Sequence, residues 1–329
     1  MSEMRWHPLL GQWIITATHR QRRTYHPPRG YCPFCPSSKA RGFTEVPRGD
    51  YDVVVFENRF PTLQQHPPRP AEPGAALTPV RPSKGICEVV LYSPEHRQTF
   101  AGLDIAQIYK LVRVWTDRYA ALGARRFVKY VLIFENKGAP VGVTLTHPHG
   151  QIYAFPFVPP LLMRELAASR RHFLQRGSCL LCDLTARERR EGERMLFAQD
   201  GFDAFVPFYA RWPYEVHVVP QRHVQDLAQF TDEERWALAR MLKRVTQSYD
   251  ALFGFSLPYM MLLHQQPTDG RRHGHYHFHV EFLPPNRTAD KLKYLASSET
   301  GAGSFSNDTL PEQTAAELRR AARRVKSDR

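Results

Sequence analysis

The heptapeptide His147-Pro148-His149-Gly150-Gln151-Ile152-Tyr153 places two histidines and an amide at alternate positions. It follows the apolar run 130–134, which predicts a β-strand, and a glycine-containing segment at 138–142. Alternate residues of a strand share one face, so His147 and His149 are expected to point to the same side. If a metal ion held His147, the strand would be fixed and the position of His149 with it.

The order of motifs around this heptapeptide occurs twice in the chain. Each half runs Cys-x-x-Cys, strand, Pro-x-x-His, long amphipathic helix, strand and His-x-His. The marker residues of the two copies are Cys32, Cys35, His96, His147 and His149, then Cys179, Cys182, His223, His277 and His279. We therefore predict an α+β fold of two similar halves, 1–165 and 166–329, each with an antiparallel sheet and one long helix.

Composition limits the class of protein. The chain has 329 residues, is 42% hydrophobic and 23% charged, and carries a net charge of +13. These values favour a globular protein and exclude a disordered one. No apolar run is long enough to predict a membrane span, and the first residues lack a signal region, so a cytoplasmic protein is expected.

The basic surplus favours anionic partners, which are nucleic acid, phosphorylated metabolites or an acidic protein. A zinc-stabilised nucleic-acid-binding protein is the alternative from another functional class, and its affinity would fall steeply with salt. That alternative gives no role to the His-x-His strands. We therefore expect no nucleic-acid partner.

Four of the five cysteines form two Cys-x-x-Cys pairs, which in a cytoplasmic chain indicates metal binding. Zinc prefers four nitrogen and sulfur ligands. The repeat predicts two zinc sites, the first formed by Cys32, Cys35, His96 and His147 and the second by Cys179, Cys182, His223 and His277. For the second metal, Glu165, His264, His277 and His279 form an alternative ligand set that suits zinc or iron. Cys87 remains, and a small buried side chain is expected there.

His149 and Gln151 are the predicted catalytic residues. A neutral imidazole is a good nucleophile toward phosphorus when one ring nitrogen is held by an acceptor. The Gln151 amide can donate to a phosphoryl oxygen but cannot carry a proton. A nucleotidyl group on His149 would thus meet no base that activates water, and it could persist until a second phosphate arrives.

Several blocks of the sequence resemble the galactose-1-phosphate uridylyltransferase family of the histidine-triad superfamily. The most specific runs from Phe134-Glu135-Asn136-Lys137-Gly138 to the His-Pro-His-Gly-Gln motif. Further blocks are Arg5-Trp6-His7-Pro8-Leu9, Thr18-His19-Arg20-Gln21-Arg22-Arg23, Phe56-Glu57-Asn58-Arg59-Phe60-Pro61 and Ser93-Pro94-Glu95-His96. The resemblance extends from about residue 5 to beyond residue 300 and implies a histidine-triad-like fold.

The resemblance implies a double displacement. UDP-glucose gives its uridylyl group to His149 and releases glucose 1-phosphate, and galactose 1-phosphate then takes the group to form UDP-galactose. It also implies a homodimer in which sugar contacts come from the partner subunit. The substrate-binding residues that it implies are Arg20 and Arg23 near the phosphates, Phe56, Asn58 and Phe60 at the uridine, Asn136 in the site, and Lys293 and Glu299 at the sugar.

Three positions depart from the family pattern: Arg59 replaces an acidic residue, Thr144 a serine and Ser298 a tyrosine. A sister enzyme that uses inorganic phosphate as acceptor, a phosphorylase of nucleoside-diphosphate sugars or dinucleotides, is the alternative within the superfamily.

Overall fold

A computed structural model describes residues 2–22, 27–28, 30–39 and 42–325. Its strands are β1 (Ser2–His7), β2 (Gln12–Ala17), β3 (Val54–Glu57), β4 (Val80–Pro82), β5 (Ile86–Leu91), β6 (Tyr130–Lys137), β7 (His149–Phe155), β8 (Met195–Gln199), β9 (Phe202–Phe205), β10 (Val216–Pro220), β11 (Tyr259–His264) and β12 (His279–Leu283). Its α-helices are α1 (Ile105–Gly123), α2 (Pro160–Arg176), α3 (Leu180–Glu191), α4 (Asp232–Phe253), α5 (Ser297–Ala302) and α6 (Pro311–Ala322). None of the helices in these ranges is long and apolar enough to cross a membrane.

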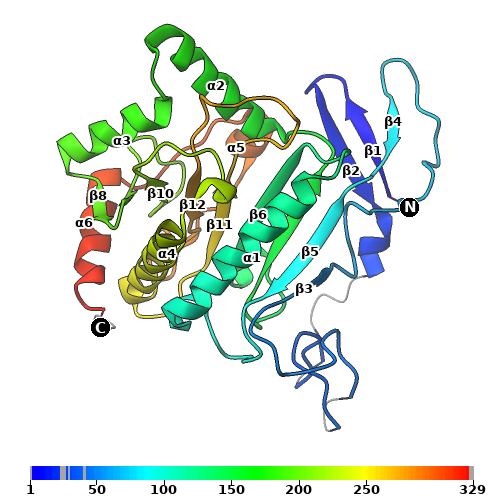
Figure 1. The fold of residues 1–329 in the computed structure, drawn as a ribbon, viewed down its shortest axis with the longest axis horizontal. Coiled ribbons are helices and arrows are strands. Elements are labelled where there is room, and N and C mark those ends of the chain that lie inside the picture. Colours follow the sequence, from blue (N-terminus) through cyan, green and yellow to red (C-terminus); the bar gives the residue numbers. More distant parts are fainter. Residues whose placement is uncertain (1, 23–26, 29, 40–41, 326–329) are drawn as a thin grey trace.

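One nine-stranded antiparallel sheet runs through both halves in the order β3-β5-β7-β6-β11-β12-β10-β9-β8. The halves meet where β6 pairs with β11, with Tyr259 opposite Lys137 and Leu263 opposite Ile133. A second sheet of three strands, β2-β1-β4, lies at one side of the molecule (Figure 1). The α+β class and the antiparallel sheets are confirmed, and the two sheets expected from the repeat are joined edge to edge.

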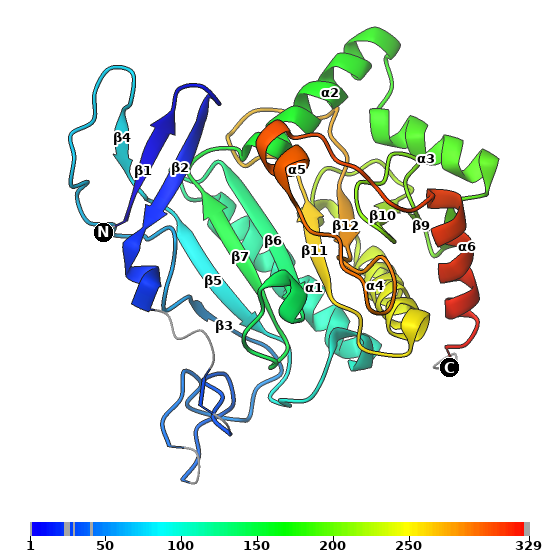
Figure 2. The ribbon, with the colours of Figure 1, turned by 180° about the vertical axis from the view of Figure 1, so that it is seen from behind.

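Helices α1 and α4 cover one face of the large sheet (Figure 1), while the opposite face is in front in Figure 2. The α1 helix begins after Asp104, whose side chain accepts from the backbone N–H of Gln107. The α4 helix begins with a capping box formed by Thr231 and Glu234. Both helices bury an apolar stripe in a core shared by the two halves. Burial of this stripe supplies most of the free energy that holds the helices on the sheet.

The alternation of β7 decides which side chains face away from the helices. Ile152 and Ala154 are fully buried and belong to the shared core. His149 and Gln151 precede them at alternate positions of the strand and are only partly buried on the other face. Gly150 lies on the helix side, where a Cβ atom would collide with the hydroxyl of Tyr92, so glycine is required there.

The buried carboxyl of Glu135 in β6 predicts a pH dependence of stability. Burial raises its pKa from 4.5 to about 7, against the attraction of Lys137 and a hydrogen bond from the Tyr259 hydroxyl. An unfolded glutamate loses its proton at lower pH than the folded one. The free energy of unfolding should therefore fall by about 3 kcal/mol as the pH rises from about 4.5 to about 7.

Glu135→Gln has no proton to lose and should not show this decrease. Chemical denaturation of both proteins at pH 5 and pH 8 measures the difference. An equal change in unfolding free energy for the two proteins would contradict the raised pKa.

Candidate functional site

The first Cys/His cluster lies between the loop after β2 and the start of β7. The candidate ligand atoms of Cys32, Cys35, His96 and His147 lie within 4.8 Å of one another. The Nδ1 atoms of both imidazoles face the sulfur of Cys35, at 3.3 Å for His96 and 3.7 Å for His147. The structure thus brings together the first predicted ligand set, in an arrangement consistent with a metal site.

His147 is held in the state that a metal ligand requires. Its Nε2 lies 2.8 Å from the carbonyl oxygen of Ser93, so the ring donates there and turns Nδ1 to the cysteines. Burial lowers the pKa of His147 to about 4, which keeps the ring neutral. The backbone of His147 in turn orients His149, because the carbonyl oxygen of His147 lies 2.8 Å from Nδ1 of His149.

This hydrogen bond fixes the tautomer of His149. With Nδ1 donating to the carbonyl, Nε2 carries the lone pair that attacks an electrophile. The Phe34 ring packs edge-on against the imidazole, with ring centroids 5.1 Å apart. Gln151 lies two residues further on the same strand face, and its Oε1 lies 3.4 Å from the Tyr153 hydroxyl that donates to it. The arrangement suits nucleophilic attack on phosphorus beside an amide donor.

His149 and Gln151 line a cavity of about 370 Å³. Phe56, Asn58 and Phe60, the three residues expected at the uridine, also line it. His149 is also shared with a neighbouring cavity of about 640 Å³, which Asn136 and Thr144 line. The imidazole thus lines two cavities, and the one shared with Gln151 has the aromatic rings of Phe56 and Phe60 in its wall.

The arginines near this cavity are placed differently from one another. Arg20 donates to the carbonyl oxygen of Phe60 at 2.9 Å, and Arg22 lines the cavity. Arg59 also lines it and pairs with Glu45 at 3.0 Å. Arg23, which the family resemblance places near the phosphates, lies outside the described residues.

The two predicted sugar contacts lie elsewhere in the same chain. Lys293 and Glu299 form an ion pair with 3.0 Å between Nζ and Oε1. They line neither of the two cavities that contain His149. Within one chain, therefore, the structure does not bring them to the candidate nucleophile.

The second Cys/His cluster repeats the geometry of the first. The candidate ligand atoms of Cys179, Cys182, His223 and His277 lie within 4.8 Å of one another. His277 Nδ1 lies 3.3 Å from the sulfur of Cys182, and its Nε2 lies 3.0 Å from the carbonyl oxygen of Pro220. This carbonyl has the position relative to His223 that Ser93 has relative to His96.

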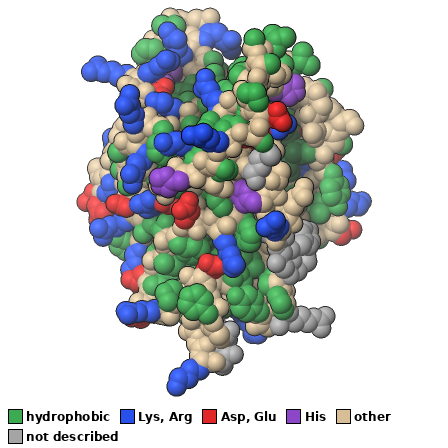
Figure 3. Space-filling model, turned by 90° about the vertical axis from the view of Figure 1, so that its right-hand side faces the viewer, with side chains coloured by type: hydrophobic (Ala, Val, Ile, Leu, Met, Phe, Trp, Pro, Cys, Tyr) green, Lys and Arg blue, Asp and Glu red, His purple; other side chains and the backbone are tan. Residues whose placement is uncertain are grey.

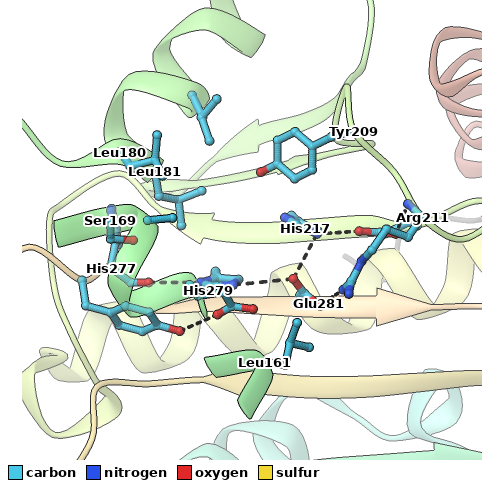
Figure 4. A pocket seen from close by; sticks show the side chains of 15 residues that line it. Leu161, Ser169, Leu180, Leu181, Tyr209, Arg211, His217, His277, His279 and Glu281 are labelled. Carbon is cyan, nitrogen blue, oxygen red and sulfur yellow. Dashed lines mark hydrogen bonds and ion pairs between the residues drawn. The ribbon is translucent and has the colours of Figure 1, made fainter. Parts of the chain in front are cut away.

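A third cluster lies beside the second, and three of its four residues, Glu165, His279 and Glu281, line a cavity of about 360 Å³ (Figure 4). It consists of Glu165, His264, His279 and Glu281. The alternative set predicted from sequence is therefore wrong in one member, because His277 belongs to the cysteine cluster and Glu281 takes its place. The two sets, weighed as alternatives, exist side by side. Although burial favours its neutral form, Glu165 and Glu281 raise the pKa of His264 to about 9.

Comparison with known proteins decides the family. The N-terminal domain of galactose-1-phosphate uridyl transferase matches residues 1–159, and its C-terminal domain matches residues 165–328. The chain belongs to the galactose-1-phosphate uridylyltransferase family. The predicted family and the predicted class of enzyme, a nucleotidyltransferase, are confirmed.

Relatives in this uridylyltransferase family resemble the chain along nearly its whole length. The galactose-1-phosphate uridylyltransferase of Thermotoga maritima is 43% identical over 320 residues, covering 97% of this chain and 98% of the relative. That of Haemophilus influenzae is 34% identical and covers 96% and 93%. A solved structure described as a uridylyltransferase is 38% identical, with a TM-score of 0.86 and 98% of both chains covered.

The basic side chains of this uridylyltransferase-family chain do not gather in one patch on the face shown in Figure 3. On the face in Figure 3, Lys and Arg side chains are interspersed with hydrophobic and acidic ones. A basic cavity wall is therefore a local feature, supplied at the candidate nucleophile by Arg22 and Arg59.

Proposed function

We propose that the protein transfers UMP from UDP-glucose to galactose 1-phosphate through a uridylyl group on Nε2 of His149. The hydrogen bond from Nδ1 of His149 to the His147 carbonyl carries the proposal, because it leaves Nε2 as the nucleophilic nitrogen. In the first half-reaction Nε2 forms a bond to the α-phosphorus, and the bond to the glucose 1-phosphate oxygen breaks. In the second, an oxygen of galactose 1-phosphate attacks that phosphorus and the imidazole leaves.

Different residues are proposed to bind the uridine and the phosphates of this substrate. Phe56, Asn58 and Phe60 are proposed to hold the uridine, and Gln151 to donate to a phosphoryl oxygen. Asn136, Arg20 and Arg23 are proposed to contact the phosphate side. Both leaving groups depart as phosphate anions, so the reaction needs no general acid, in agreement with an amide at position 151.

We propose zinc at both Cys/His clusters, since four sulfur and nitrogen ligands around one point are typical of closed structural zinc sites. The zinc would neutralise the thiolates and fix the strand that carries the nucleophile. The Glu165, His264, His279 and Glu281 cluster offers nitrogen and oxygen ligands, which suit zinc or iron.

The proposal also assigns a role to each half of the chain and an oligomeric state to the protein. Residues 1–165 would carry the nucleophile and the first zinc, and residues 166–329 the second metal site. A homodimer is proposed because Lys293 and Glu299 lie away from the His149 cavities of their own chain, as expected if they serve the partner. The cytoplasm, where both phosphorylated substrates occur, is the proposed location.

The decisive test is the intact mass of the protein after incubation with UDP-glucose and no acceptor. A UMP adduct on His149 is expected, and it should disappear when galactose 1-phosphate is added. No adduct under conditions that support turnover would exclude the double displacement. Replacing galactose 1-phosphate by inorganic phosphate tests the phosphorylase alternative, which predicts faster discharge of the adduct by phosphate.

Gln151→Ala should slow both half-reactions by about 100-fold, because a donor to the charged transition state is lost while the fold and metal remain. Gln151→His adds a proton carrier at the same position. We expect that variant to release more UMP to water relative to UDP-galactose formed. Rapid-quench assays of each half-reaction and the ratio of UMP to UDP-galactose measure the two effects. An unchanged ratio in Gln151→His would mean that the amide does not protect the intermediate.

A further inference from the structure

We propose that the cavity in the second half binds two divalent cations bridged by the carboxylate of Glu281. The first position lies among Glu165, His264, His279 and Glu281, and the second among Glu215, His217 and Glu281. No step of the proposed transfer reaction uses an ion at the second position.

One carboxylate oxygen faces ligand nitrogens of both positions. Oε1 of Glu281 lies 3.7 Å from Nε2 of His279 and 4.0 Å from Nδ1 of His264. The same oxygen lies 3.5 Å from Nε2 of His217. The other oxygen, Oε2, is held at 3.1 Å by the Arg211 guanidinium, so the carboxylate is oriented with Oε1 toward the three imidazoles. Separations of this size are those between ligands around a common ion.

The two groups share only Glu281. In each group the ligand atoms lie within 4.8 Å of one another, and no such group among the described residues contains both Glu165 and Glu215. Glu165 comes from α2, whereas Glu215 directly precedes β10. Two ions, one on either side of the Glu281 carboxylate, would use every ligand of both groups. Known two-metal sites hold their ions about 3.5–4 Å apart.

The charge of the cluster selects cations. Glu215 and Glu281 are nearly inaccessible to solvent, and Glu165 is more than half-buried, while Arg211 is the cationic side chain that pairs with Glu281. Buried carboxylates need compensating positive charge, which Arg211 supplies in part and which protonated imidazoles or metal ions supply for the rest. Three imidazoles in the same cluster favour zinc, manganese, iron or cobalt over magnesium or calcium.

His217 offers one ring nitrogen to the second position. Its Nε2 is 2.9 Å from Oε1 of Glu215, but its Nδ1 is buried without a hydrogen-bond partner. The residue is 3% exposed and lines the cavity, whose wall includes Leu181 and Tyr209 (Figure 4). The nitrogen that faces the second position is Nε2, which lies close to the carboxylates of both Glu215 and Glu281. An ion at this position would therefore be bound through Nε2, on the side of the ring opposite the unpaired Nδ1.

The internal repeat shows what changed between the two cavities, which have similar volumes of about 370 and 360 Å³. In the first half Val89 pairs with Gln151, two residues after His149. In the second half His217 pairs with Glu281, two residues after His279. A neutral pair in the nucleotide cavity thus corresponds to a ligating pair here.

The test uses Mn²⁺ binding to the full chain, followed by electron paramagnetic resonance. The wild-type cavity should bind two Mn²⁺ with a spectrum showing exchange coupling between them. His217→Leu and Glu215→Gln should each bind one Mn²⁺ without coupling. His66→Leu, which removes an exposed histidine, is the matched control and should retain two coupled ions. Cys179→Ser reports any Mn²⁺ that enters the cysteine cluster.

One uncoupled Mn²⁺ in the wild-type cavity, or two coupled ions in both His217→Leu and Glu215→Gln, would overturn the proposal. The UMP adduct formed from UDP-glucose is measured on the same samples. An adduct together with a single Mn²⁺ would refute the second metal position and leave the transferase proposal intact. Two coupled ions without an adduct would support the second metal position and refute the transferase proposal.

Discussion

Replacing His149 by alanine is expected to abolish both the UMP adduct and the exchange of uridylyl groups. In the proposed mechanism the imidazole supplies the only bond that holds UMP between the two half-reactions, so turnover should fall by roughly 10⁴- to 10⁶-fold. Folding should be little affected, because the side chain is partly exposed and lies on the strand face away from the helices. Intact-mass spectra and a coupled assay for UDP-galactose measure the two losses.

His66→Ala is the control for this experiment, since it removes an exposed histidine outside both cavities at His149. It should form the adduct at the wild-type rate. Appreciable exchange in His149→Ala would mean that another residue is the nucleophile. Loss of turnover with an intact adduct would place the UMP group on another residue and leave His149 a role in the second half-reaction alone.

Cys35→Ser is expected to remove one zinc per chain and to reduce the rate by about 100-fold. Its sulfur faces both imidazoles of the first cluster, and His147 in that cluster holds the carbonyl that orients the nucleophile. A displacement of about 1 Å at a reacting group typically costs this much in rate. Metal analysis, thermal unfolding and the rate of adduct formation measure the three consequences.

Cys87→Ala separates the loss of a ligand from the loss of a cysteine. Cys87 is fully buried and belongs to neither cysteine cluster. The Cys87→Ala protein should keep its zinc and most of its activity. Full zinc content in Cys35→Ser would contradict the ligand set, and wild-type activity in a zinc-depleted Cys35→Ser would contradict the link between the metal and the nucleophile.

The sequence predicted the fold class because the period of each element is visible locally. The apolar positions of 105–122 recur at helical spacing, and the helix α1 follows them. Predicting the ligand sets required the repeat of motifs, since the ligands of each cysteine cluster are far apart along the chain. The structure brings both predicted sets together.

Other features depended on strand pairing and could not be predicted from one sequence. Nothing in the local sequence shows that β6 pairs with β11, because every strand edge offers the same backbone N–H and C=O groups. Glu281 was missed, although it follows His279 at the spacing of Gln151 after His149, and alternation alone would have placed it on that face. His217 and Glu215 were missed because only the pairing of β10 with β12 brings them to Glu281.

The shared sheet has a consequence for how the chain can be divided. Cutting between residues 165 and 166 would expose the β6 edge of one fragment and the β11 edge of the other, each a row of unpaired N–H and C=O groups. Such edges pair with whatever strand they meet and promote aggregation. The two fragments produced separately should therefore be insoluble, while production in the same cell lets each edge find its partner. On this expectation the two copies of the motif order form one unit of folding, in which neither copy is stable alone.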